Sequence, residues 1–195
     1  MNDLDYQDVV TSFAERYHVL AGLAHVVHNP AEAGAKAADI LREAGVTLAA
    51  MAGLPGDLVD PVVRGLADAG IDCDSGPFPS VELPGRIDRA SAGITGADFA
   101  IAQSGTLVEI ATNDAVRLVS SLPRTHIGIV RARDIVPRFE DAAPRLREIF
   151  NAHGGGCTVS FISGPSRTGD IELKLTLGVH GPEIAHAIVI ADGEQ

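Results

Sequence analysis

Cysteine and tryptophan are scarce in this 195-residue chain, which has two cysteines and no tryptophan. Cys73 and Cys157 lie far apart, and neither belongs to a C-x-x-C pair. They cannot supply the thiolates of an iron–sulfur cluster or a structural zinc site, so we interpret them as free thiols of a reducing compartment. Aromatic residues make up only 4% of the chain. The core must therefore consist of small aliphatic side chains, which suits helices packed closely on a buried sheet.

Positive charge and long apolar segments are also lacking. The chain has 15 Lys and Arg against 26 Asp and Glu, which gives a formal net charge of −11 with histidine neutral. An acidic surface repels nucleic acid and anionic lipid, so we exclude both as partners. The N-terminus has no basic segment followed by an apolar stretch, and no apolar run reaches the roughly 18 residues that span a bilayer. We therefore expect a cytoplasmic protein with no membrane insertion.

Several common catalytic and metal-binding motifs are absent. No G-x-x-x-x-G-K-[ST] loop or G-x-G-x-x-G fingerprint occurs, which argues against a P-loop and a standard dinucleotide-binding fold. Residues 164–168 resemble a nucleophile elbow but have Thr168 in place of the closing glycine, which argues against a serine hydrolase. His25 and His28 are three residues apart with no evident third ligand, so we expect no metal site.

Alternating strand and helix patterns predict the fold class. Asn29, Pro30 and Glu32 have the residue types of a helix N-terminus, and Gly45 provides a helix end. Short connections between such units favour parallel strands with right-handed crossovers. We expect an α/β fold with an open, mixed, largely parallel sheet flanked by helices. The length fits a single domain over residues 1–195, with an N-terminal helical segment over 1–20.

The individual elements follow from the same patterns. Helices are predicted over 4–17, 30–44, 57–70 and from a cap at Asp134 through about Phe150, and strands over 24–28, 46–52, 71–76, 125–131, 158–162 and 183–191. Residues 97–111 predict a β-hairpin that turns at residues 103–105, and residues 77–86 predict a proline-rich loop. Residues 170–177 fit a half-buried strand, or a helical first turn that continues into extended chain, which we prefer.

The segment SGPSRTGDIE, residues 163–172, is the first candidate site. It follows a predicted strand, and open α/β sheets bind ligands at the carboxyl ends of their strands. Its candidate ligand-binding residues are Gly164, Ser166, Arg167 and Thr168, and its candidate catalytic residues are Asp170 and Glu172. Arg167 offers a planar fork of donors that matches a carboxylate or phosphate, and a carboxylate beside it could accept a proton from a substrate. The alternative is a surface turn in which Asp170 caps a helix.

Two further segments carry candidate residues. The hairpin turn AQSGTL, residues 102–107, adds four candidate ligand-binding residues: Gln103, Ser104, Gly105 and Thr106. His180, in the constrained turn GVHGP, and His126, in a predicted strand, are candidate acid–base groups. The alternatives are an ordinary hairpin turn that needs glycine and two histidines with structural roles.

Four ordered segments together resemble a known family. GITGADFAIAQSGTLVEI (93–110), SSLPRTHIGIV (120–130), GPSRTGDIE (164–172) and LGVHGP (177–182) look like successive motifs of the lactate-utilisation protein C family, the LUD-domain proteins. The first part of the chain shares only the strand–helix rhythm of that family. The chain departs from the family pattern at Gln103, where an acidic residue is usual, at Ser104, where Thr is usual, and at Gly169, where Ala is usual. The loss of a carboxylate at Gln103 weakens any scheme that needs a base there.

The resemblance implies a fold similar to the glucosamine-phosphate isomerase, ribose-phosphate isomerase and CoA-transferase group. It also implies a role in the oxidation of L-lactate to pyruvate beside two companion subunits that carry iron–sulfur clusters. Because this chain lacks the cysteines for such clusters, we expect it to bind no cofactor itself and expect the clusters on the partner subunits.

The sequence leaves three functions open. The leading hypothesis is the small LUD subunit of an L-lactate-oxidising system, with a pocket for a small organic anion such as lactate, pyruvate or a sugar phosphate. The second is a non-catalytic scaffold that docks the iron–sulfur subunits. The third, from fold analogy, is a stand-alone sugar-phosphate isomerase or CoA-transferase-like enzyme.

Overall fold

The computed structural model describes residues 3–154, 156–168 and 176–191. One sheet comprises β1 (Leu23–Val27), β2 (Leu48–Ala52), β3 (Asp72–Asp74), β4 (Ala92–Gly96), β7 (Thr125–Arg131) and β12 (Ile184–Ile190). A second comprises β5 (Phe99–Ile101), β6 (Thr106–Ala111), β8 (Ile135–Val136) and β9 (Thr158–Ile162), and β10 (Arg167–Thr168) pairs with β11 (Thr176–Leu177). The α-helices are α1 (Asp3–Val19), α2 (Pro30–Glu43), α3 (Gly56–Asp68), α4 (Asp114–Ser121) and α5 (Ala143–His153). Short 3-10 turns are η1 (Ser80–Glu82), η2 (Ile87–Arg89), η3 (Ala132–Asp134) and η4 (Phe139–Ala142).

The first sheet has six strands in the order β1-β12-β7-β4-β2-β3, and all of its pairs are parallel. The second sheet has four strands in the order β8-β5-β6-β9, of which only β5 and β8 pair in parallel. The predicted α/β class with a largely parallel, helix-flanked sheet is confirmed. The predicted hairpin also forms, as β5 and β6, but it belongs to a separate sheet.

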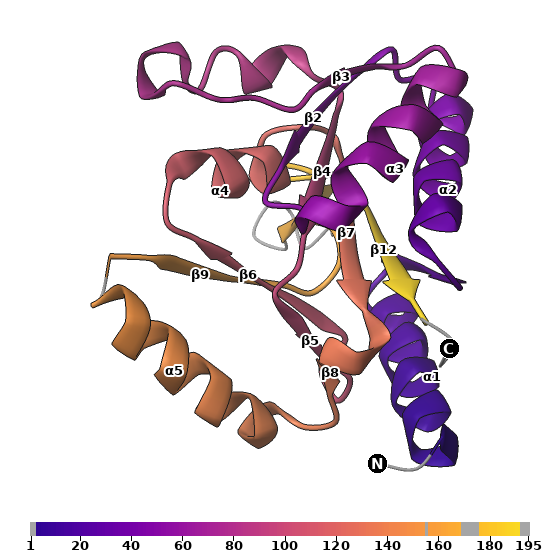
Figure 1. Cartoon of the computed structure of the whole chain (residues 1–195), viewed down its shortest axis with the longest axis vertical. Coiled ribbons are helices and arrows are strands. Elements are labelled where there is room, and N and C mark those ends of the chain that lie inside the picture. The colour runs from indigo at the N-terminus through magenta and orange to yellow at the C-terminus, as the bar shows by residue number, and fades with distance from the viewer. Residues whose placement is uncertain (1–2, 155, 169–175, 192–195) are drawn as a thin grey trace.

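Each face of the six-stranded sheet is covered by different elements (Figure 1). α2 and α3 pack on one face, around a core that includes Leu41, Leu66 and Ile127. On the other face, α1 and the four-stranded sheet cover the β7–β12 half, and α4 covers the β2–β4 half. α5 packs on the far side of the four-stranded sheet. None of the helices in the described ranges has the length and hydropathy needed to cross a membrane.

Small residues let these layers approach closely, as the low aromatic content predicts. α2 and α3 cross where Gly34 faces the backbone of Pro61 and Gly65 faces the backbone of Gly34. β4 meets α4 where Gly93 faces the carbonyl of Val119. A Cβ atom at any of these three glycines would overlap backbone atoms, so the helices could not dock at these distances with larger residues.

The start and end of α2 confirm the predicted capping residues. Asn29 Oδ1 accepts a hydrogen bond from the Glu32 amide at 2.9 Å, and Glu32 Oε2 accepts one from the His28 amide at 2.8 Å. Pro30 occupies the first turn, and Gly45, just beyond the helix, has φ +67°. These contacts satisfy backbone groups that a helix terminus would otherwise leave unpaired.

The helix predicted from Asp134 through about Phe150 is wrong in its first half and confirmed in its second, as α5. Residues 132–142 form η3, β8 and η4, and α5 begins only at Ala143. The amides of Ala102 and Gln103 donate to the carbonyls of Val136 and Pro137, both at 2.9 Å. This pairing beside β5 holds the chain extended where a helix was expected, because tertiary hydrogen bonds outweigh local helix propensity.

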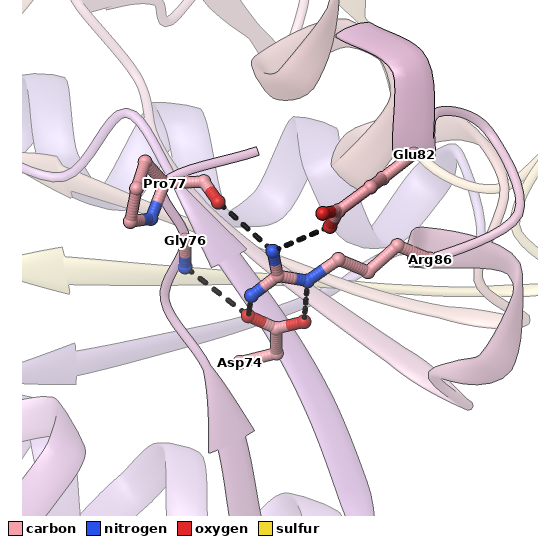
Figure 2. A network of polar contacts seen from close by, with 5 residues as sticks. All are labelled: Asp74, Gly76, Pro77, Glu82 and Arg86. Carbon is pink, nitrogen blue, oxygen red and sulfur yellow. Dashed lines mark hydrogen bonds and ion pairs between the residues drawn. The ribbon is translucent and has the colours of Figure 1, made fainter. Parts of the chain in front are cut away.

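The loop between β3 and β4 is ordered by one ion-pair network (Figure 2). Arg86 donates to both carboxylate oxygens of Asp74 at 2.7 Å, to Glu82 Oε2 at 2.8 Å and to the Pro77 carbonyl at 3.0 Å. The Gly76 amide adds a bond to Asp74 at 3.2 Å. Chiefly through the hydrogen bonds from Arg86, the pKa of Asp74 is held below its ordinary value. A segment that the sequence marks only as a proline-rich loop therefore has a fixed conformation.

Candidate functional site

A cavity of about 360 Å³ lies at the carboxyl ends of β2, β4 and β7. It is lined by Gly53, Leu54, Pro55, Leu58, Gly96, Ala97, Asp98, Ile129, Arg131 and Asp134. In the six-stranded sheet, β2 and β4 are neighbours. The chain leaves β2 towards β3, on the side of β2 away from β4, and it leaves β4 towards β7, on the side of β4 away from β2. Open α/β sheets bind ligands where the strand order reverses in this way, and known small-molecule sites start at about 300 Å³. We call this cavity the strand-end pocket.

Two glycines are among the residues that line the strand-end pocket. Gly53 follows β2 with φ +69°, and Gly96 ends β4. A Cβ atom on Gly96 would lie 2.5 Å from the Gly53 carbonyl oxygen and 3.0 Å from Pro55 Cδ. The connection from β2 to α3 can therefore lie against the end of β4 only because residue 96 has no side chain. This contact places the first turn of α3, with Leu58, in the pocket wall.

Charged groups of both signs line the strand-end pocket. Arg131, at the end of β7, forms an ion pair with Asp57 in the first turn of α3. Its side chain is only 12% exposed, so its guanidinium lies within the pocket wall and not in bulk water. Asp98 and Asp134 contribute carboxylates. The lining therefore offers guanidinium donors for an anion and carboxylate acceptors for hydroxyl groups.

Asp98 has an electrostatic environment that suits proton exchange. Its Oδ2 accepts a hydrogen bond from the Ile110 amide at 2.8 Å. Partial removal from solvent raises the pKa of Asp98, and the negative charges of Glu109 and Asp134 raise it further, against the opposing effect of the Ile110 amide. Asp98 thus holds a proton at higher pH than an ordinary aspartate, as acid–base groups in binding sites often do.

The residues of the predicted hairpin turn lie away from this pocket, against α1. Ser104 Oγ is 2.7 Å from Thr106 Oγ1, which is 2.8 Å from Ser163 Oγ. Gly105 has φ +58°, and a Cβ atom there would lie 2.7 Å from the Tyr17 amide nitrogen. The hydroxyl groups therefore bond to one another, and the glycine permits close contact with α1.

The segment around Arg167 lies beside that turn. The Ser166 amide donates to the Pro182 carbonyl at 2.9 Å, and Ser166 Oγ accepts from the His180 amide at 3.3 Å. The guanidinium of Arg167 donates to the carbonyl of Leu20, at the end of α1. The three predicted segments do meet, but the contacts are largely among themselves and with backbone. None of their described residues lines the strand-end pocket.

The other predicted residues are scattered. Gln103 Oε1 accepts from the Phe139 amide at 3.1 Å, and Gly164, with φ +85°, packs against Leu20. Thr168 pairs with Thr176 in the β10–β11 ladder. His126 is fully buried on β7, and His180 is exposed. Asp170 and Glu172 lie outside the described residues.

The histidines and cysteines form no evident metal site. His25 Nε2 lies 3.1 Å from His186 Nδ1, and burial, followed by the charges of His25 and His126, lowers the pKa of His186 to about 4. Within the described ranges, no group of three or more His, Cys, Asp or Glu side chains is placed to hold a metal ion. Cys73 and Cys157 are free and partly buried.

Sequence reasoning missed the residues that line the strand-end pocket. Asp98 belongs to the turn that follows β4, but this strand has the sequence AGITG, whose two glycines weaken the strand pattern. With β4 unrecognised, Asp98 was assigned to a hairpin instead of the end of a parallel strand. The sequence does carry one signal for this site. Four small or apolar residues, 92–95, fit a short buried strand, and they are followed by Gly96 and then by the carboxylate of Asp98.

Known proteins resemble this chain in sequence. The family model described as "LUD domain" matches residues 10–190. Proteins named lactate utilization protein C are similar to parts of it: that of Geobacillus sp. (strain WCH70) is 43% identical over 106 residues, and that of Bacillus subtilis (strain 168) is 40% identical over 108 residues. These matches cover 54% and 55% of this chain but only 44% and 45% of the relatives. The chain thus matches less than half the length of each relative.

A solved structure resembles the chain over nearly its whole length. A DUF162 family protein from Deinococcus radiodurans has a TM-score of 0.63 and 26% sequence identity. The match covers 95% of this chain and 98% of that protein. The overall fold of this chain is therefore similar to that of a solved structure.

Proposed function

The chain belongs to the LUD domain family, and on that premise we propose that it is a small LUD-domain subunit of an L-lactate utilisation system. In this proposal it binds a small organic acid, and the electron carriers for lactate oxidation are iron–sulfur clusters on partner subunits. Relatives named lactate utilization protein C support the process. The two cysteines of the sequence support placing the clusters elsewhere, since one such cluster usually needs four thiolates.

The observation that carries the ligand-binding part is the lining of the strand-end pocket. L-Lactate has a carboxylate, which Arg131 can bind with paired donors. It also has a hydroxyl group, which can donate to the carboxylate of Asp98. Leu54, Leu58 and Ile129 supply apolar surface for the methyl group. The pocket therefore offers a complement to each part of a 2-hydroxy acid.

The three segments predicted from the sequence stay a second candidate for the anion site. Arg167 is exposed at their junction, and its planar donors suit a carboxylate equally well. The strand-end pocket is the better supported of the two, because it combines a cavity, a guanidinium and a carboxylate of raised pKa at the ligand-binding edge of the sheet.

Calorimetric titration of the purified chain tests the proposal. L-Lactate should bind, and acetate should bind more weakly, because acetate has no hydroxyl group to donate to Asp98. The loss of one hydrogen bond to a charged group corresponds to roughly tenfold in affinity. Pyruvate, whose keto group only accepts, should also bind more weakly than lactate. Equal heats for lactate and acetate, or no binding of either, would contradict the proposed ligand.

A non-catalytic docking role is favoured by one observation. Phe139, Phe150 and Phe161 are 56%, 50% and 46% exposed, and the ring centroids of Phe139 in η4 and Phe161 on β9 are 6.0 Å apart. Exposed aromatic side chains are typical of protein interfaces. If the chain acts mainly as a scaffold, Phe161→Ser should abolish co-purification with the iron–sulfur subunits and leave lactate binding intact.

A further inference from the structure

Three polar side chains meet in the space between the two sheets. Thr95 on β4 donates its hydroxyl hydrogen to Glu109 Oε1 on β6, and Thr95 Oγ1 lies 2.7 Å from His126 Nε2 on β7. His126 Nε2 is also 3.4 Å from Glu109 Oε1. All three residues are at most 1% exposed. Because the hydroxyl of Thr95 has a single hydrogen, its bond to Glu109 leaves His126 Nε2 to donate to Thr95.

Some polar atoms in this cluster and beside it have no hydrogen-bond partner among the described residues. Glu109 Oε2, His126 Nδ1 and the hydroxyl of Tyr17 on α1 are buried with no hydrogen-bond partner in the described part of the chain. Burial, and then the charge of Glu109, raises the pKa of Tyr17, which places that hydroxyl within the electrostatic reach of the carboxylate. Buried polar atoms without partners destabilise a fold by about 1–3 kcal/mol each. Glu109 is the polar exception among its neighbours on this face of β6, since Leu107 and Ala111 are apolar and buried.

The cluster is connected directly to the strand-end pocket through β6. Three consecutive residues of β6 each bond to residues 95–98. The Val108 carbonyl accepts from the Asp98 amide at 2.9 Å, Glu109 holds the side chain of Thr95, and the Ile110 amide donates to the Asp98 carboxylate at 2.8 Å. The segment that includes the pocket residues Gly96, Ala97 and Asp98 is therefore fixed at both of its ends, and Glu109 lies between the two contacts to Asp98.

We propose that Glu109 is a positioning residue of the strand-end pocket, which acts through Thr95 and Asp98. It holds the β4–β5 connection against β6, and it lies one residue from the amide that binds Asp98, so that its negative charge acts on the Asp98 carboxyl group that faces the ligand's hydroxyl. This inference rests on the strand-end pocket as the ligand site of the proposed function. It extends that function by naming the residue that controls the acid–base state of the site.

Several charged groups face Asp98, and their signs decide what Glu109 contributes. Glu109 from β6 and Asp134 from η3 repel a negative charge on Asp98. Two arginines beside these groups are paired with carboxylates: Arg131 on β7 with Asp57 on α3, and Arg145 on α5 with Asp134. The positive charge of each is therefore balanced in part. Removal of the Glu109 charge should therefore make Asp98 lose its proton at lower pH.

A carbon-13 NMR titration of the Asp98 carboxyl group in the ligand-free chain tests the inference. The midpoint should fall by about 0.5–1 pH unit in Glu109→Gln, which keeps the acceptor for Thr95 but removes the charge. Glu148→Gln removes the same charge from the exposed face of α5 and should leave the midpoint unchanged. Tyr17→Phe removes an unpartnered hydroxyl from the cluster and should also leave it unchanged. An unchanged midpoint in Glu109→Gln would overturn the electrostatic role.

Thr95→Val provides a second test if Glu109→Gln does not fold. It removes the hydroxyl that fixes Glu109 while keeping the branched shape, so lactate affinity should fall several-fold, and Thr95→Ser should restore it. Failure of Thr95→Ser to restore binding would mean that only packing matters at this position and would overturn the positioning role. Because the titration needs no ligand, it can succeed even if lactate proves to be the wrong ligand, which separates this inference from the proposed function.

Discussion

Two polar regions of this molecule differ in what their polar groups do. In the region around Ser104, Thr106 and Ser166, hydroxyl groups bond to one another and to backbone amides. In the strand-end pocket, Arg131, Asp98 and Asp134 line a cavity of about 360 Å³. The segments of the first region are dense in polar residues along the sequence, whereas the second region is assembled from three less polar stretches of chain, residues 53–58, 96–98 and 129–134.

The difference teaches that polar density along a sequence is a poor guide to a ligand site. Neighbouring polar residues can form hydrogen bonds with one another and with nearby backbone groups. Such a cluster stabilises a turn but offers no donors or acceptors to a ligand. Charged groups that converge from the ends of parallel strands point into common space, because the ends of those strands lie at one edge of the sheet. The two regions should therefore respond differently to substitution.

A pair of glycine substitutions gives the largest expected effect. A Cβ atom at Gly96 would overlap Gly53, and one at Gly105 would overlap the backbone of Tyr17. We expect each of Gly96→Ala and Gly105→Ala to lower the free energy of unfolding by about 2–3 kcal/mol, because close-packed sites tolerate added atoms poorly. Urea denaturation measures this. Of the two, only Gly96→Ala should also weaken lactate binding. Weakened binding in Gly105→Ala would contradict the distinction between the regions.

The two arginines provide a matched comparison of binding. Arg131→Gln should weaken lactate binding roughly tenfold or more, because it removes a charged donor pair from the pocket wall. Arg167→Gln should leave the affinity within the error of the titration. Asp57→Asn breaks the ion pair with Arg131 while keeping the guanidinium, and it controls for loss of that pair. The opposite pattern, with Arg167 essential and Arg131 dispensable, would place the anion site at the predicted segments.

Thr106→Val tests the region around Ser104, Thr106 and Ser166. It removes the hydroxyl that links Ser104 to Ser163, so we expect a loss of about 1 kcal/mol in the free energy of unfolding. Lactate affinity should not change. A lower affinity with unchanged stability would show that these hydroxyl groups serve a ligand.

The smallest expected effect is the change in the stability of the fold with pH that is caused by Asp98. The pKa of Asp98 is raised in the folded state, so between the pKa of an unfolded aspartate, about 3.9, and the raised value the folded protein binds more protons. Its stability therefore falls as pH rises through that window. Asp98→Asn, which cannot ionise, should melt at a higher temperature than the wild type at neutral pH. The difference should disappear below the unfolded pKa, and melting curves across this range measure it.

The sequence was sufficient for the fold class and for most elements of the six-stranded sheet. Asn29, Glu32 and Gly45 mark α2 because capping is local chemistry, and the hairpin at residues 97–111 follows from alternation around a glycine turn. β8 and the late start of α5 could not be predicted, because the pairing of residues 135–137 with β5 depends on contacts distant in sequence.

The candidate site was less predictable than the fold. The family resemblance was confirmed by the LUD domain match, but it does not say which polar residues converge. Glu109 lies in a strand whose two faces are both covered, so no alternation marks it as buried. Arg131 ends a strand that was predicted correctly, but its place in a pocket depends on α3 and on Gly96. Pockets of this kind follow from strand order, which a single sequence does not reveal.

The most direct test of the central claim is an amide NMR titration of the intact chain with L-lactate. The account predicts saturable shifts for the amides of Gly53, Gly96 and Arg131, with little change at Gly105 and Ser166. Saturable shifts confined to Gly105, Ser166 and their neighbours would contradict it and would place the ligand at the polar segments beside α1.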